Sequence, residues 1–159
     1  MDFVVTRVID APVGKVWQAW SDPVYVKQWW GPTGFIAPVA QMDFREGGTS
    51  LVCMRSPDGH DIFNTWTYRA IVPMERIEFV SKFADENGDA LDPAAIGMPP
   101  DVPREVPHVV ALTSLHDSKT EVTVTEFGYE PGPVLEMSRT GQEQCLNKMA
   151  VVLTGRPIG

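Results

Sequence analysis

The chain has 159 residues, a hydrophobic fraction of 43% and a net charge of −8, from 21 acidic and 13 basic residues. This length predicts one domain over residues 1–159, and the acidic balance argues against nucleic acid or an anionic membrane as a partner. No apolar run approaches the about 18 residues that insert into a bilayer, and the first residues lack a signal-peptide pattern. Two cysteines are too few for a disulfide scaffold, so we expect a cytoplasmic protein.

The first part of the chain predicts one strand followed by two short helices. Phe3–Ile9 is dense in β-branched residues, which favour strands. A helix follows, with Asp10 as its cap and Pro12 in its first turn. A second short helix begins at Asp22-Pro23, and Gly31-Pro32 ends it.

From Phe35 the hydrophobic period changes to two, which predicts a meander of antiparallel strands. The expected strands are Phe35–Phe44, Thr49–Arg55, Asp61–Val72, Arg76–Phe83, Val106–Leu115 and Glu121–Phe127. Pro38 places the first of them at a sheet edge or a bulge. Pro57-Asp58-Gly59 predicts a tight turn. The segment Ala84–Pro107 shows no sustained period, so we expect either a functional lid or a poorly ordered excursion.

The last element, from Pro131 to about Leu153, predicts a helix of roughly 20 residues. Pro133 suits its first turn, and Gly155 followed by Pro157 ends it. Its apolar stripe is interrupted by small and polar residues, namely Ser138, Gly141, Gln142 and Cys145. Two interpretations remain open, which are ordinary packing against a sheet and space for a ligand.

The order of these elements predicts an α+β fold. One curved antiparallel sheet wraps around the long C-terminal helix, and the two short helices follow the first strand. If the sheet curls around the helix, a cavity forms between them.

Two blocks of residues resemble a known family. The first block is Val5–Pro12, Val16–Pro23 and Trp29-Trp30-Gly31-Pro32; the second is Gly47-Gly48, Met54, Pro57-Asp58-Gly59, Tyr68 and Val72–Ile77. Both resemble the homologues of the activator of the ATPase of the ninety-kilodalton heat-shock protein, in the START-like, helix-grip superfamily. The resemblance implies that the sheet grips the C-terminal helix and that the space between them commonly holds a hydrophobic ligand. Gly141-Gln142 departs from the Gly-Trp expected in the family, which enlarges or polarises the middle of the cavity.

Residues on the inward faces form a candidate ligand site. Its members are Trp30, Asn64, Trp66, Tyr68, Phe79, Ser138, Gly141, Gln142, Cys145 and Met149. Trp66 and Tyr68 combine an apolar ring with a polar group, which suits a pocket wall, although alternating aromatics are also typical of a core. Of Trp29 and Trp30, we expect one in the core and the other on the rim of the cavity.

The titratable residues do not form a recognisable catalytic motif. Glu126 shares the parity of Val122 and Val124, which would point its side chain inward. A buried carboxylate can act as an acid or a base. Because Glu126 stands at a strand end, we nevertheless expect it in solvent. The three histidines lack metal-ligand spacing, and neither Cys53 nor Cys145 has an activating base in the sequence. We therefore expect no metal, no cofactor and no catalytic residue.

Three functions remain open. The first is a binding module for an apolar or amphipathic small molecule, with polar groups from Gln142, Ser138, Tyr68 and Asn64 and with Ala84–Pro107 as a lid. The second, implied by the resemblance alone, is a co-chaperone that contacts a heat-shock ATPase. The third is a cyclase or dehydratase of an apolar substrate that uses Glu126 or a histidine as base. The chain is expected to be a monomer or a homodimer.

Overall fold

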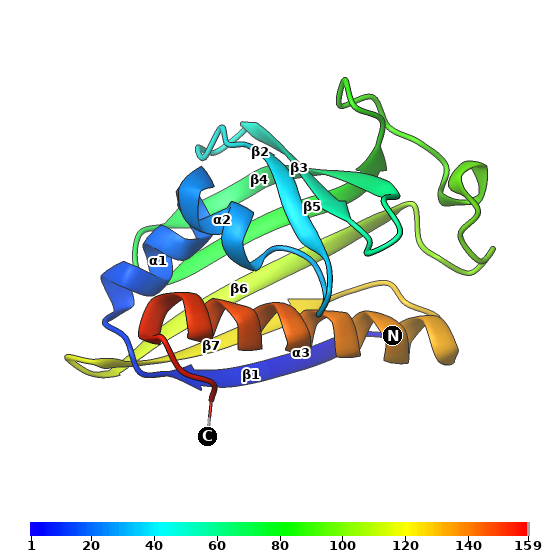
Figure 1. The fold of residues 1–159 in the computed structure, drawn as a ribbon. Helices are drawn as coiled ribbons and strands as arrows, with labels where there is room; N and C mark the ends of the chain where they lie inside the picture. The colour runs from blue at the N-terminus through cyan, green and yellow to red at the C-terminus, as the bar shows by residue number, and fades with distance from the viewer. Residues whose placement is uncertain (159) are drawn as a thin grey trace.

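The computed structural model describes residues 1–158 and shows a curved sheet with the helices on its concave side (Figure 1). The elements are β1 (Phe3–Ile9), α1 (Val13–Ser21), α2 (Pro23–Trp29), β2 (Ile36–Gln41), β3 (Thr49–Arg55), β4 (Asp61–Val72), β5 (Arg76–Ala84), the short 3₁₀ helix η1 (Pro93–Ile96), β6 (Glu105–His116), β7 (Lys119–Glu126) and α3 (Pro133–Thr154). The strands pair antiparallel in the order β1-β7-β6-β5-β4-β3-β2. The predicted helix-grip, α+β arrangement is confirmed.

The helix ends follow their sequence signals in α2 and α3 but not in α1. Asp22 caps α2, because its Oδ1 accepts a hydrogen bond from the Val24 amide at 2.9 Å. Pro133 stands in the first turn of α3, and Gly155 ends it with φ +76°. The prediction that Asp10 caps α1 is wrong. Pro12 occupies the N-cap position, so Asp10 lies two residues before it, and no side chain caps the helix. Asp10 pairs with Arg156 at 3.3 Å instead.

The predicted edge strand and tight turn are confirmed. β2 lies at the edge of the sheet, and its register with β3 shifts between Ile36 and Val39, around Pro38. A proline is tolerated there because an edge or bulge position does not require its missing N–H. In the turn before β4, Gly59 adopts φ +90° and its amide donates to the Ser56 carbonyl at 2.9 Å.

An aromatic cluster fills the space between the N-terminal helices and the sheet. Trp20 and Trp29 lie 4.7 Å apart, and both face Trp66 of β4 at 6.4 Å between ring centroids. The Trp29 indole Nε1 donates to the Ala19 carbonyl at 2.8 Å. That carbonyl has no partner within a helix, because the residue four positions later is Pro23, which lacks an N–H. Trp29 therefore both packs the core and completes the end of α1.

The helices carry no hydrophobic span. Among residues 1–158, none is long and apolar enough to cross a bilayer. The longest helix, α3, instead presents one buried face to the sheet, which includes Leu135, Leu146 and Met149.

Candidate functional site

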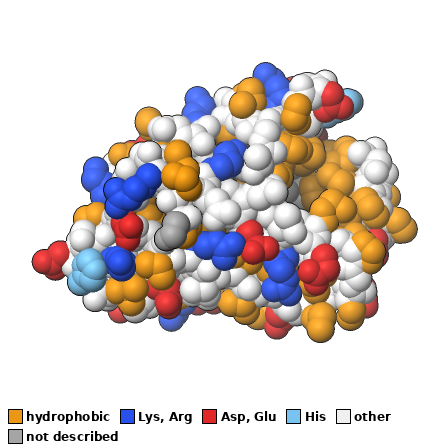
Figure 2. Space-filling model, turned by 60° about the horizontal axis from the view of Figure 1, so that its bottom comes forward, with side chains coloured by type: hydrophobic (Ala, Val, Ile, Leu, Met, Phe, Trp, Pro, Cys, Tyr) orange, Lys and Arg blue, Asp and Glu red, His pale blue; other side chains and the backbone are white. Residues whose placement is uncertain are grey.

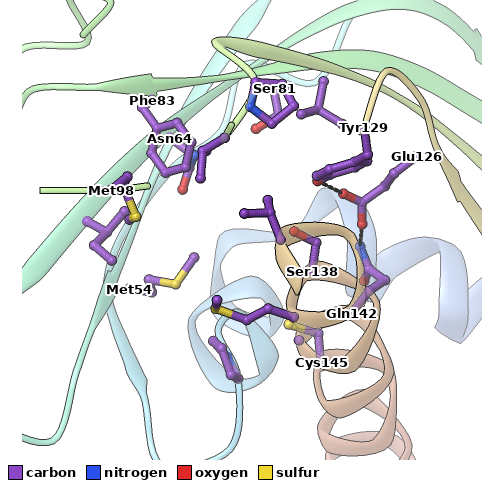
Figure 3. Close-up of a pocket in the computed structure, with 18 of the residues that line it drawn as sticks. Met54, Asn64, Ser81, Phe83, Met98, Glu126, Tyr129, Ser138, Gln142 and Cys145 are labelled. Carbon is purple, nitrogen blue, oxygen red and sulfur yellow. Dashed lines mark hydrogen bonds between the residues drawn. The ribbon is translucent and has the colours of Figure 1, made fainter. Parts of the chain in front are cut away.

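A cavity of about 290 Å³ lies between the sheet and α3 (Figure 3). Its walls come from β3 to β7, the residues that follow α2, the first half of α3 and residues 98–103. Most lining side chains are apolar, among them Met54, Ile62, Phe83, Val106, Val134 and Met137. Figure 2 shows hydrophobic side chains gathered around a hollow at the right of the molecule.

The cavity exists because the tryptophan cluster fills only part of the concave face. On β4, Ile62 and Asn64 line the cavity, whereas Trp66 on the same face lies under the tryptophans of α1 and α2. Beside the part of the face that is not filled, α3 contributes Ser138, Gly141 and Cys145, which are small residues. The interruptions in the apolar stripe of α3 therefore coincide with the unfilled space.

The structure divides the ten candidate ligand residues into two groups. Six line the cavity: Trp30, Asn64, Ser138, Gly141, Gln142 and Cys145. The other four, Trp66, Tyr68, Phe79 and Met149, belong to the packed core and do not line it. Tyr68 illustrates the reason, since its hydroxyl bonds to Ser50 Oγ at 2.9 Å and its ring lies 5.0 Å from Phe44. The expectation for the tryptophan pair is confirmed, with Trp29 in the core and Trp30 at the cavity.

Several residues that line the cavity were not predicted from the sequence. Ser81 shares a face with Phe79 and Phe83, so strand parity could have found it. Met98 and Val102 come from the segment between β5 and β6, for which the sequence predicted either a functional lid or a poorly ordered excursion. Their place on the cavity wall favours the lid interpretation.

A lysine on α3 holds the rim of the cavity. Lys148 Nζ donates to the carbonyls of Gly31, Pro32 and Phe35 at 3.0, 3.4 and 3.1 Å. Burial lowers the pKa of Lys148 below its usual value. These bonds fix the segment after α2 against α3 and so position Pro32 and Phe35 on the cavity wall.

Glu126 is buried, and the expectation that it faces solvent is wrong. It is 5% exposed and lines the cavity. Tyr129 Oη donates to its Oε1 at 2.8 Å, and Gln142 Nε2 donates to its Oε2 at 2.9 Å (Figure 3). The chain turns back after β7 through Gly128, with φ +91°, and α3 covers the strand end. The strand end is therefore enclosed rather than open to water.

His108 of β6 lies beside this carboxylate and is 7% exposed. Its Nε2 is 3.4 Å from Glu126 Oε1, its Nδ1 is 2.9 Å from the Val106 carbonyl, and its ring stacks on Phe79 at 4.6 Å. Glu126, His108, Tyr129 and Gln142 thus form a buried polar cluster at one end of an apolar cavity. Charged and hydrogen-bonding interactions are strong in such surroundings.

Burial decides the protonation of two neighbouring groups. It raises the pKa of the Cys145 thiol to about 12, so this cysteine is a neutral thiol near pH 7 and a poor nucleophile. Burial together with the Glu126 charge raises the pKa of Tyr129 above its usual value. Tyr129 therefore keeps its proton and acts as a hydrogen-bond donor.

Three polar atoms of cavity residues have no hydrogen-bond partner in the part of the chain that the structure describes: Trp30 Nε1, Asn64 Oδ1 and Gln142 Oε1. Glu126 determines which end of the Gln142 amide faces it. A carboxylate only accepts hydrogen bonds, so the donating Nε2 group points toward it and Oε1 is left without a partner among these residues. Over the same residues 1–158, no three His, Cys, Asp or Glu side chains lie close enough to hold a metal.

The fold, with a curved antiparallel sheet around a C-terminal helix and a cavity between them, defines a START-like, helix-grip protein. The family model of Activator of Hsp90 ATPase homolog 1-like protein matches residues 10–154, so the chain belongs to this family. The sequence resemblance is thereby confirmed. A comparison with curated proteins gave no match.

Solved structures share the fold. A protein from Arthrobacter aurescens is 26% identical, with a TM-score of 0.78 over 98% of this chain and 87% of that one. Protein CV1439 from Chromobacterium violaceum is 23% identical, with a TM-score of 0.77 over 96% of each chain. The AHSA1 protein from Silicibacter pomeroyi is 16% identical, with a TM-score of 0.76 over 96% of this chain and 97% of that one.

Proposed function

We propose that the protein binds an apolar or amphipathic small molecule in the cavity between the sheet and α3. The observation that carries this proposal is the cavity of about 290 Å³, which the protein's own side chains leave unfilled. Ligand sites are concave and mostly apolar with a few fixed polar groups, and they begin at about 300 Å³. The wall and the polar cluster of Glu126 and His108 match that description.

The size and lining of the cavity favour a small, largely apolar ligand. Met54, Met98 and Met137 contribute three thioether side chains to the wall. Methionine adapts its shape to irregular ligands and makes favourable contacts with aromatic rings. Residues 98–103 serve in this proposal as the lid, because Met98 and Val102 line the cavity from the long connection between β5 and β6.

Thermal unfolding against a panel of fatty acids, sterols, flavonoids and smaller aromatic compounds tests the proposal. A ligand at about 100 times its Kd stabilises the folded state by ~2.7 kcal/mol. For a chain of this length that corresponds to roughly 5–10 °C in Tm. A shift of this size with one chemical class is the expected result. No shift with any compound would contradict the proposal.

A matched pair of variants locates the ligand. Ser138 lines the cavity, and its hydroxyl points into it in Figure 3, so Ser138→Trp fills the space. Val151 lies on the same helix but is 45% exposed and outside the cavity, so Val151→Trp is the control. We expect the ligand-induced shift in Tm to disappear in Ser138→Trp and to persist in Val151→Trp. Equal shifts in both variants would place the ligand elsewhere.

A chaperone-associated role is the alternative, and family membership supports it. In this case the protein changes the ATPase rate of a heat-shock chaperone of the ninety-kilodalton class. The steady-state rate of that chaperone with and without the protein tests the alternative. An unchanged rate at saturating protein would contradict it.

A further inference from the structure

His108 and Glu126 bring two side chains that can exchange protons into contact at the cavity wall. The Val106 carbonyl only accepts hydrogen bonds, so its 2.9 Å contact with His108 Nδ1 places a proton on Nδ1. The second ring nitrogen, Nε2, lies 3.4 Å from Glu126 Oε1.

The surroundings of Glu126 offer hydrogen-bond donors and one basic side chain. Tyr129 and Gln142 donate to the two carboxylate oxygens, but neither group carries a charge. In the described chain, His108 is the one basic side chain within 4 Å of Glu126. A buried carboxylate needs a counter-charge or a proton. The pair therefore combines a base and an acid side by side, and both residues line the cavity.

The remaining groups of the cavity limit what this pair can do. Cys145 is a neutral thiol, and over residues 1–158 no cluster is suited to a metal. A reaction that needs only one base and one acid is the transfer of a proton from carbon to oxygen. We infer that Glu126 and His108 form a general acid–base site that interconverts the keto and enol forms of an apolar carbonyl compound. This inference rests on the proposed binding of a small molecule in the cavity.

The proton balance of the step closes within the pair. The Glu126 carboxylate removes a proton from the carbon next to the carbonyl, and the C–H electron pair becomes the C=C bond of the enol. The C=O π pair moves onto oxygen, which takes the Nε2 proton of the His108 imidazolium. The pair then contains a protonated Glu126 and a neutral His108. Transfer of the proton from Oε1 to Nε2 restores the starting carboxylate and imidazolium. Tyr129 and Gln142 are positioning residues that hold the carboxylate.

Exchange of α-protons for deuterium measures this reaction directly. The probes are 2-tetralone and 2-indanone, apolar cyclic ketones with acidic C–H groups, followed by proton NMR in D₂O. We expect the protein to accelerate exchange over buffer by about 10²-fold or more, the size of a general acid–base effect. The same ketones are tested for binding by their effect on Tm.

Three variants separate catalysis from folding. Glu126→Gln keeps the network, because Tyr129 still donates to the new amide and the free Gln142 Oε1 accepts from it after rotation. We expect this variant to bind the ketone with little change and to lose the acceleration. His108→Gln is expected to lose it as well. Glu121→Gln changes a carboxylate on the outer face of the same strand, away from the cavity, and is expected to retain the wild-type rate.

The outcomes distinguish this inference from the proposed function. Binding of the ketones without acceleration, or equal acceleration by wild type and Glu126→Gln, would overturn the acid–base site and leave the binding function standing. Binding of other compounds but of neither ketone would also overturn it. The absence of any ligand-induced shift in Tm across both panels would overturn the binding function and, with it, this inference.

Discussion

Replacing Trp29 by phenylalanine tests the account of the aromatic core. Trp29 is fully buried, and its indole N–H donates to the Ala19 carbonyl at 2.8 Å. Since Pro23 cannot donate to that carbonyl, Trp29→Phe leaves a buried acceptor without a partner. Trp20→Phe is the matched control. Trp20 is 2% exposed in the same cluster, but its Nε1 has no partner among the described residues.

The two substitutions remove the same atoms and differ in the hydrogen bond. The lost ring volume costs about 1–2 kcal/mol in either variant. In Trp29→Phe, the unpaired carbonyl adds about 1–3 kcal/mol. In Trp20→Phe, removing an unpaired N–H returns a similar amount. We therefore expect the free energy of unfolding to fall by about 3 kcal/mol for Trp29→Phe and by less than about 1 kcal/mol for Trp20→Phe.

Equilibrium unfolding in urea, followed by far-UV circular dichroism, measures both values without relying on tryptophan fluorescence. The expected result is a lower midpoint for Trp29→Phe at an unchanged slope. Equal losses in the two variants would refute the reasoning, because ring volume alone would then explain them.

Alkaline pH is expected to lower stability through buried groups. Burial raises the pKa of Cys145 and Tyr68 to about 12, from ordinary values of 9.0 and 10.0. The unfolded chain loses these protons first, so the free energy of unfolding falls as pH rises from about 9 to 12. Urea titrations should show a smaller fall in Cys145→Ala, and an identical fall would contradict this. Gly48→Ala places a Cβ against the Asp43 carbonyl and should cost at least about 2 kcal/mol by urea unfolding; a neutral effect would disprove the overlap. Arg55→Met breaks an exposed ion pair with Asp61 and should leave the urea midpoint almost unchanged, because solvent screens such pairs; a clearly lower midpoint would contradict this.

The sequence by itself determined the elements and their order. Strand parity put Asn64 and Trp66 on one face of β4, and Pro133 with Gly155 marked the ends of α3. Such signals are local, because they depend on backbone geometry and on the alternation of side chains within one segment. The family resemblance then converted the order of elements into the helix-grip fold.

Only the tertiary structure decided which part of the interior is filled. Asn64 and Trp66 have the same parity, yet the first lines a cavity and the second lies under Trp20 and Trp29. Parity separates inside from outside but does not say which element covers each position along a strand. Glu126 shows the same limit, since its burial depends on Tyr129, on Gln142 of α3 and on His108 of β6. These residues approach one another only when β7 is enclosed between β6 and α3. The carboxyl group is tolerated in the interior because Tyr129 and Gln142 donate hydrogen bonds to it and His108 lies beside it.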